Sequence, residues 1–119
     1  FIQYTYARIR SVLRKAEAEG MDLTDYAGVK PGEREIAVIQ RLADYPSVVA
    51  EAGRSYSPAL IANYVYDLVK EYNQFYHDCS ILKEEDPAVR ALRLALSLCT
   101  ARTIESGMGL LGIRVPERM

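Results

Sequence analysis

The first fifteen residues set aromatic rings beside permanent positive charges at a helical spacing. Wound at about 3.6 residues per turn, the segment FIQYTYARIRSVLRK places Phe1, Tyr4, Arg8 and Lys15 on one side. Rings next to cations suit an unpaired nucleobase, which offers a flat π surface on an anionic backbone. Aromatic residues at a helix edge also pack against their own protein. The pattern alone therefore leaves both interpretations open.

Charge is segregated along a chain whose net charge is only −1. A nucleic-acid-binding role must therefore rest on local patches rather than on overall basicity. Arg8, Arg10, Arg14 and Lys15 form a basic run with no acid before Glu17, and the last third of the chain is basic again. Charge runs also occur on ordinary solvated surfaces. The segregation favours a basic patch near the start without identifying its ligand.

Residue sets that carry catalysis are missing from the sequence. It contains no glycine-rich phosphate loop and no nucleophile elbow. His77 and Cys79 lie two positions apart on a predicted helix, so they point to different sides. One histidine and two cysteines, outside any metal-ligand spacing, predict no metal site. We therefore expect no catalytic residues, cofactor or metal in this chain itself.

Nothing in the sequence indicates a membrane or a secretory route. No apolar run is long enough to cross a bilayer, and no signal peptide is visible. Cys79 and Cys99 fall within helical patterns, so we expect buried free thiols in a reducing cytosol. The sequence therefore predicts a cytoplasmic protein without a membrane partner.

Helix start and stop signals divide the chain into short segments. Gly20 is a predicted C-cap, and Ser57-Pro58 and Asp86-Pro87 each predict an N-cap followed by a first helical position. Tyr45-Pro46 predicts a break. The expected helices cover residues 1 to about 20, 33–43, 46–52, 58 to about 79 and 87 to about 108. Because no two-residue alternation occurs, the predicted class is all-α, a bundle of about five helices in one domain over residues 1–119.

Motifs distributed over nearly the whole chain resemble the C-terminal, DALR-type anticodon-binding domain of arginyl-tRNA synthetases. The start, FIQYTYARIRSVLRK, is similar to the family's Y-[VI]-Q-Y-x-x-A-R-[IL]-x-S-V-x-R-K. Further similar segments are LIANYVYDL at 60–68, FYHDC at 75–79, ALRL at 91–94 and GLLGIRVPERM at 109–119. The last segment is highly specific. The resemblance implies a helical domain that holds the anticodon stem and loop of arginine tRNA.

The resemblance also implies which residues form the pocket. Arginine codons are read by anticodons whose middle base is C, and single-stranded bases are recognised by stacking and edge hydrogen bonds. Carried over by position, the anticodon-binding residues are Phe1, Tyr4, Arg8, Tyr76 and Met119. The family usually has Tyr where this chain has Phe1, so a hydroxyl contact is absent there. Residues expected to contact phosphates are Arg10, Arg14, Lys15, Arg93 and Arg118.

The active site of such a class I synthetase lies outside this sequence. Its His-Ile-Gly-His and Lys-Met-Ser-Lys-Ser type signatures are not present, so ATP and Mg are expected only for a catalytic domain of the same parent protein. We expect the chain, which begins with Phe rather than Met, to be a fragment of that arginine–tRNA ligase, with arginine tRNA and no DNA as its partner. Two alternatives are a helical protein–protein interaction module and the anticodon-binding domain of another class I synthetase.

Overall fold

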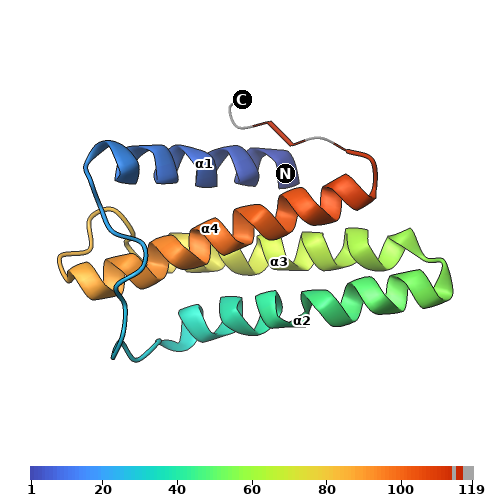
Figure 1. Cartoon of the computed structure of the whole chain (residues 1–119), viewed down its shortest axis with the longest axis horizontal. Helices are drawn as coiled ribbons and strands as arrows, with labels where there is room; N and C mark the ends of the chain where they lie inside the picture. The colour runs from blue at the N-terminus through green and yellow to red at the C-terminus, as the bar shows by residue number, and fades with distance from the viewer. Residues whose placement is uncertain (114, 117–119) are drawn as a thin grey trace.

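Four helices make up the computed structural model, which describes residues 1–113 and 115–116. They are α1 (Ile2–Ala18), α2 (Glu33–Ser55), α3 (Pro58–Asp78) and α4 (Pro87–Leu110). Figure 1 shows α1 and α2 on opposite sides of the bundle, with α3 and α4 between them. The all-α prediction is confirmed. Among the described residues, no helix is both long and apolar enough to cross a membrane.

Local signals explain where three of the helices begin or end. The Asp86 carboxylate accepts a hydrogen bond from the Ala88 N–H at 3.0 Å and thereby caps α4. Gly20 adopts a φ of +70° after α1, a conformation that favours glycine. Gly32 precedes α2, and its N–H donates to Glu35 Oε1 at 2.6 Å. These ends agree with the sequence predictions to within a few residues.

The predicted break at Pro46 is wrong, because α2 continues through it. Proline lacks the N–H that a helix interior uses, but tertiary contacts hold both halves of α2 in place. Val38 and Ala52, on either side of Pro46, are buried in the core. Tyr64 of α3 donates its hydroxyl to the Arg41 carbonyl, one turn before the proline. Two predicted helices thus merge into one, which reduces the expected five to four.

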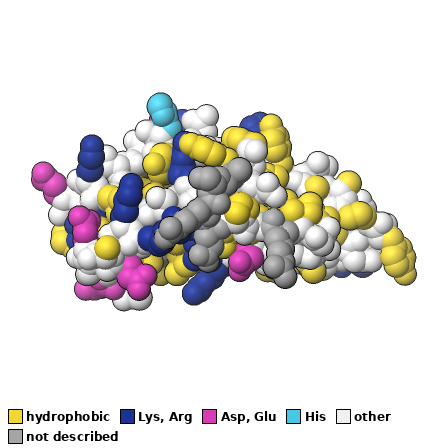
Figure 2. Space-filling view, turned by 90° about the horizontal axis from the view of Figure 1, so that it is seen from above, with side chains coloured by type: hydrophobic (Ala, Val, Ile, Leu, Met, Phe, Trp, Pro, Cys, Tyr) yellow, Lys and Arg dark blue, Asp and Glu magenta, His cyan; other side chains and the backbone are white. Residues whose placement is uncertain are grey.

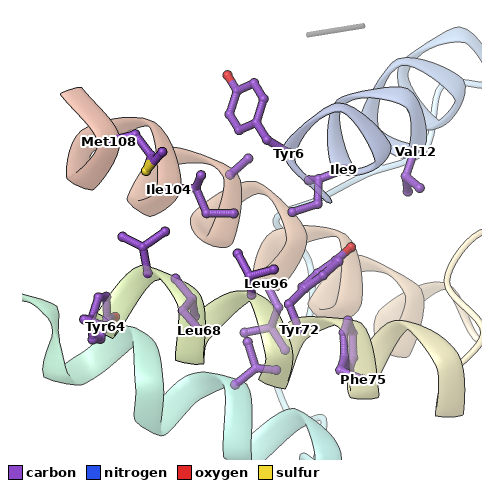
Figure 3. Packing of buried hydrophobic residues seen from close by; sticks show 14 of the residues in the cluster. Tyr6, Ile9, Val12, Tyr64, Leu68, Tyr72, Phe75, Leu96, Ile104 and Met108 are labelled. Carbon is purple, nitrogen blue, oxygen red and sulfur yellow. The ribbon is translucent and has the colours of Figure 1, made fainter. Parts of the chain in front are cut away.

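The core lies where α4 packs between the other three helices. α4 contacts α1, α2 and α3, as expected for a helix that is apolar around most of its circumference. Figure 3 shows Ile9 of α1, Leu68 of α3, and Leu96 and Ile104 of α4 directed into the space between these helices. Gly107 also belongs to this packing, because its position faces Val65 of α3. The face of α1 opposite the core is left at the surface.

The cysteines do not lie as the sequence predicted. Cys79 follows α3 and is half-buried, and Cys99 on α4 is exposed. The prediction of buried thiols rested only on the fact that both residues fall within helical patterns. α4 has core contacts over most but not all of its circumference, and Cys99 falls on the part that faces solvent.

Candidate nucleic-acid interface

A hollow lies between α1 and the C-terminal part of α3. Its volume is about 440 Å³. The residues that line it are Tyr4, Ala7, Arg8, Ser11, Val12, Arg14, Lys15 and Tyr76. The structure therefore brings together Tyr4 and Arg8, which lie about one turn apart on α1, and Tyr76, which is far from both in the sequence. We call this site the first hollow.

The Arg8 guanidinium lies over two tyrosine rings that line the first hollow. Its Cζ atom is 5.1 Å from the centroid of the Tyr4 ring and 4.6 Å from that of Tyr76. A guanidinium at these distances is attracted to the face of the ring. Tyr4 is 55% exposed, and Tyr76 is half-buried. The result is a partly open stack of flat groups to which another flat group can be added.

A neutral amide holds Arg8 in this position. Arg8 Nη1 donates to Asn73 Oδ1 at 3.2 Å, and Asn73 Nδ2 donates to Thr5 Oγ1 at 3.0 Å. Thr5 is buried, so the second hydrogen bond fixes which way the amide points. Sequence reasoning missed Thr5 and Asn73. The available signal was spacing, because Asn73 lies one turn before Tyr76 on the same side of α3.

Tyr76 is supported from below by a buried tyrosine. The rings of Tyr72 and Tyr76 have centroids 6.3 Å apart, and the Tyr72 hydroxyl lies 2.9 Å from Ser97 Oγ of α4. Burial raises the pKa of the Tyr72 hydroxyl well above its usual value, so the group is neutral at physiological pH. The site therefore rests on the core rather than on a loop.

The first hollow carries positive charge. Arg14 and Lys15 line it together with Arg8, and none of the salt bridges within the described residues involves Arg8 or Lys15. Figure 2 views the molecule from above, the side on which α1 lies in Figure 1, and shows Lys and Arg side chains among hydrophobic ones, with most acids toward the left end. An anionic ligand with flat groups would find complementary chemistry here.

Phe1 and Arg10 lie outside the first hollow. The Phe1 ring contacts Tyr66 of α3 edge-on, with centroids 5.8 Å apart, and lines a different hollow. The Arg10 guanidinium lies over Tyr6, and its Nε donates to the Tyr6 hydroxyl at 3.1 Å. Phe1 lies just before α1 and Arg10 lies on it, but their side chains point to other sides of the helix than Arg8 does.

Arg93 is paired within the chain, and its predicted phosphate contact stays a prediction. Its Nε lies 3.1 Å from Glu35 Oε2, and its Nη1 lies 3.0 Å from Glu84 Oε2 and donates to the Ser80 carbonyl at 2.6 Å. The Arg93 side chain is only 16% exposed. Its charge is used to join α4, the start of α2 and the loop after α3. Arg118 and Met119, also predicted from sequence, lie outside the described residues.

The lining of the first hollow decides what chemistry it can do. Among the described residues, no group of three or more His, Cys, Asp or Glu side chains is placed so as to hold a metal ion. Besides the apolar Ala7 and Val12, the first hollow is lined by two rings, three cations and one serine. This set can stack a flat group, hydrogen-bond its edge and neutralise an anion.

Comparison with known proteins places this geometry in a family. The sequence matches the family model of the DALR anticodon binding domain over residues 2–119. It is 62% identical over 121 residues to the arginine–tRNA ligase of Porphyromonas gingivalis (strain ATCC 33277) and 59% identical to that of Bacteroides thetaiotaomicron. Each match covers 100% of this chain and 20% of the relative. The chain thus spans about a fifth of the length of these proteins.

A solved structure supports the same assignment. The arginyl-tRNA synthetase of Thermus thermophilus superimposes with a TM-score of 0.85 at 34% sequence identity. The match covers 99% of this chain and 20% of that one. The sequence match to the family model and the similarity to this solved structure therefore indicate the same family. The chain belongs to the DALR anticodon-binding domain family.

Proposed function

We propose that this chain is the tRNA-binding part of an arginine–tRNA ligase and holds the anticodon loop of arginine tRNA in the first hollow. The observation that carries the proposal is Arg8, which lies over the rings of Tyr4 and Tyr76 and is held by a neutral amide. No carboxylate among the described residues forms a salt bridge with it. The relatives named arginine–tRNA ligase support the choice of arginine tRNA.

The chemistry of the first hollow suits the middle anticodon base, cytosine. Tyr4 and Tyr76 offer ring faces on which a splayed base stacks. The cytosine edge presents two neighbouring acceptors, O2 and N3, and a guanidinium presents parallel N–H donors that match such a pair. Arg8 is therefore the residue that reads the base edge. Met119 stays a prediction as an apolar wall of the same pocket.

Phosphate contacts fall to the remaining cations of the first hollow. Arg14 and Lys15 line it beside Arg8 and are the proposed partners of the loop backbone. Arg10 faces Tyr6 on another side of α1, and Arg118 stays a prediction. The parent protein would supply the catalytic domain with its ATP and Mg, and would act in the cytoplasm.

Binding of short RNA stem-loops tests the proposal. The chain is titrated with a fluorescent arginine anticodon stem-loop and with versions that carry U, A or G at the middle anticodon position. Loss of the correct edge hydrogen bonds should weaken binding by about 10-fold or more. Affinity should also fall as salt rises. Equal affinity for all four middle bases would contradict the proposal, provided that circular dichroism shows a folded protein.

A further inference from the structure

A second hollow adjoins the first and has no role in the function proposed above. Its volume is about 250 Å³, and it lies between the end of α3, the loop that follows and the middle of α1. The residues that line it are Val12, Tyr76, Cys79, Ser80, Ile81, Leu82 and Lys83. Val12 and Tyr76 also line the first hollow. The two hollows are therefore neighbours, with Tyr76 as a shared wall.

The walls of the second hollow are apolar and its rim is polar. Val12 and Ile81 are buried, and Leu82 is half-buried. Ser80 and Lys83 are exposed beside them. A slot of this kind fits a flat base against the apolar side chains, while the cation meets the phosphate attached to it. Each nucleotide of a single strand carries both groups, a flat base and a phosphate.

Ion pairs hold the loop that forms one wall of the second hollow. Arg93 Nη1 binds the Ser80 carbonyl at 2.6 Å and Glu84 Oε2 at 3.0 Å. Arg93 Nε pairs with Glu35 of α2, which is buried. Arg93 thus ties the loop at Ser80 and Glu84 to α4 and, through Glu35, to α2. A wall fixed before binding lowers the ordering cost of capturing a ligand.

We propose that the second hollow is a nucleotide subsite, which takes the base next to the one held beside Arg8. This inference rests on the proposed function, because it needs an RNA strand in the first hollow. Successive unstacked bases on one strand can occupy neighbouring slots separated by an aromatic side chain. Tyr76 separates the two bases, and Lys83 contacts the phosphate between or beside them. The occupant is a neighbouring nucleotide of the same anticodon loop.

The two cysteines provide a direct test with an internal control. Cys79 lines the second hollow, whereas Cys99 is exposed on α4 and is not among the described lining residues of either hollow. Burial raises the pKa of the Cys79 thiol, so labelling with a thiol reagent is followed by mass spectrometry above neutral pH. A saturating arginine anticodon stem-loop should slow labelling of Cys79 several-fold and leave Cys99 unchanged.

Abasic RNA locates the nucleotide responsible. Stem-loops that lack the base on the 5′ or the 3′ side of the middle anticodon position are compared at saturating concentration. One of the two should restore Cys79 labelling while the RNA stays bound, and its affinity should fall roughly 10-fold. If the intact RNA binds with the expected base preference but leaves Cys79 labelling unchanged, the subsite is wrong and the proposed function stands. If the RNA does not bind, both are wrong.

A charge variant gives an independent measurement. Lys83→Ala should weaken binding of the intact stem-loop and lower the slope of log affinity against log salt by about 0.7. The control is Arg54→Ala, which removes one positive charge at the opposite end of the bundle, where α2 ends (Figure 1). Its affinity and salt slope should match those of the unmodified chain. Equal effects of the two variants would overturn the phosphate contact at Lys83.

Discussion

Arg8 owes its availability to the residue that holds it. Asn73 accepts from its guanidinium with an amide oxygen, so Arg8 is positioned without being neutralised. Arg93 shows the opposite arrangement, with two carboxylates around one guanidinium. Both residues are arginines on helices with partly buried side chains. The partner, rather than the arginine itself, distinguishes the residue that we propose binds RNA from the one that is paired with carboxylates.

Replacing the amide by a carboxylate therefore tests how Arg8 works. Asn73→Asp should keep the fold, because the new carboxylate can pair with Arg8, but should weaken stem-loop binding by roughly 10-fold as the charge is neutralised. Fluorescence anisotropy at one salt concentration measures the change. The control is Asn63→Asp, which adds the same negative charge at an exposed position of α3. If both variants lose the same affinity, the effect is long-range repulsion and the specific role of Asn73 is wrong.

The two rings of the first hollow should contribute by stacking. Tyr4→Ala and Tyr76→Ala should each cost about 1–3 kcal/mol of binding free energy. Tyr76→Phe keeps the ring and should cost much less. The comparison variant is Tyr66→Ala, which removes an exposed ring from α3 outside the first hollow. Unchanged RNA affinity in both alanine variants of the first hollow would remove these rings from the site.

At the scale of the helices, the sequence predicted correctly the helix ends that depend on local signals. Asp86-Pro87 and Ser57-Pro58 mark the starts of α4 and α3, and both helices begin where expected. Pro46 misled the prediction because its local effect is outweighed by contacts of α2 with α3. Such contacts join residues far apart in the chain and leave no short-range pattern. The same reason explains why the ion pairs of Arg93 and the contact of Asn73 with Arg8 were not predicted.

Gly107 lies where α4 and α3 approach each other closely. A Cβ atom there would lie 2.7 Å from Val65 Cγ2, whereas none of the described atoms lies within 4 Å of one added at Gly109. Valine is stiff at χ1, so the helices must shift apart. Gly107→Ala should lower the free energy of unfolding by about 1–3 kcal/mol.

Gly109→Ala is the matched control for that contact. It lies on the same helix, is exposed and should leave stability unchanged or raise it by up to about 1 kcal/mol. Urea unfolding followed by circular dichroism measures both variants. A Gly107→Ala protein as stable as the Gly109→Ala protein would show that the close approach is not required.

At the scale of the whole molecule, the shape of the first hollow depends on helix packing contacts that lie outside it. α1 and α3 supply its lining, and both pack on α4. Three buried tyrosines join these helices: Tyr6 to Glu105 and Tyr72 to Ser97, both on α4, and Tyr64 to the Arg41 carbonyl of α2. Burial raises the pKa of all three hydroxyls. Their ionisation thus couples the stability of the bundle to alkaline pH.

The raised pKa values of the tyrosine hydroxyls determine how stability changes with pH. Tyr64 has a pKa of about 12 in the folded chain against 10.0 for the free side chain. Its contribution is complete below pH 10 and is lost as pH rises toward about 12, because the unfolded chain releases its proton first. The free energy of unfolding in urea should therefore fall steadily over this window at constant ionic strength. Tyr64→Phe should lose about 1 kcal/mol at neutral pH with its hydrogen bond, yet fall less steeply above pH 10. An equally steep fall in the variant would show that Tyr64 does not contribute to the alkaline loss.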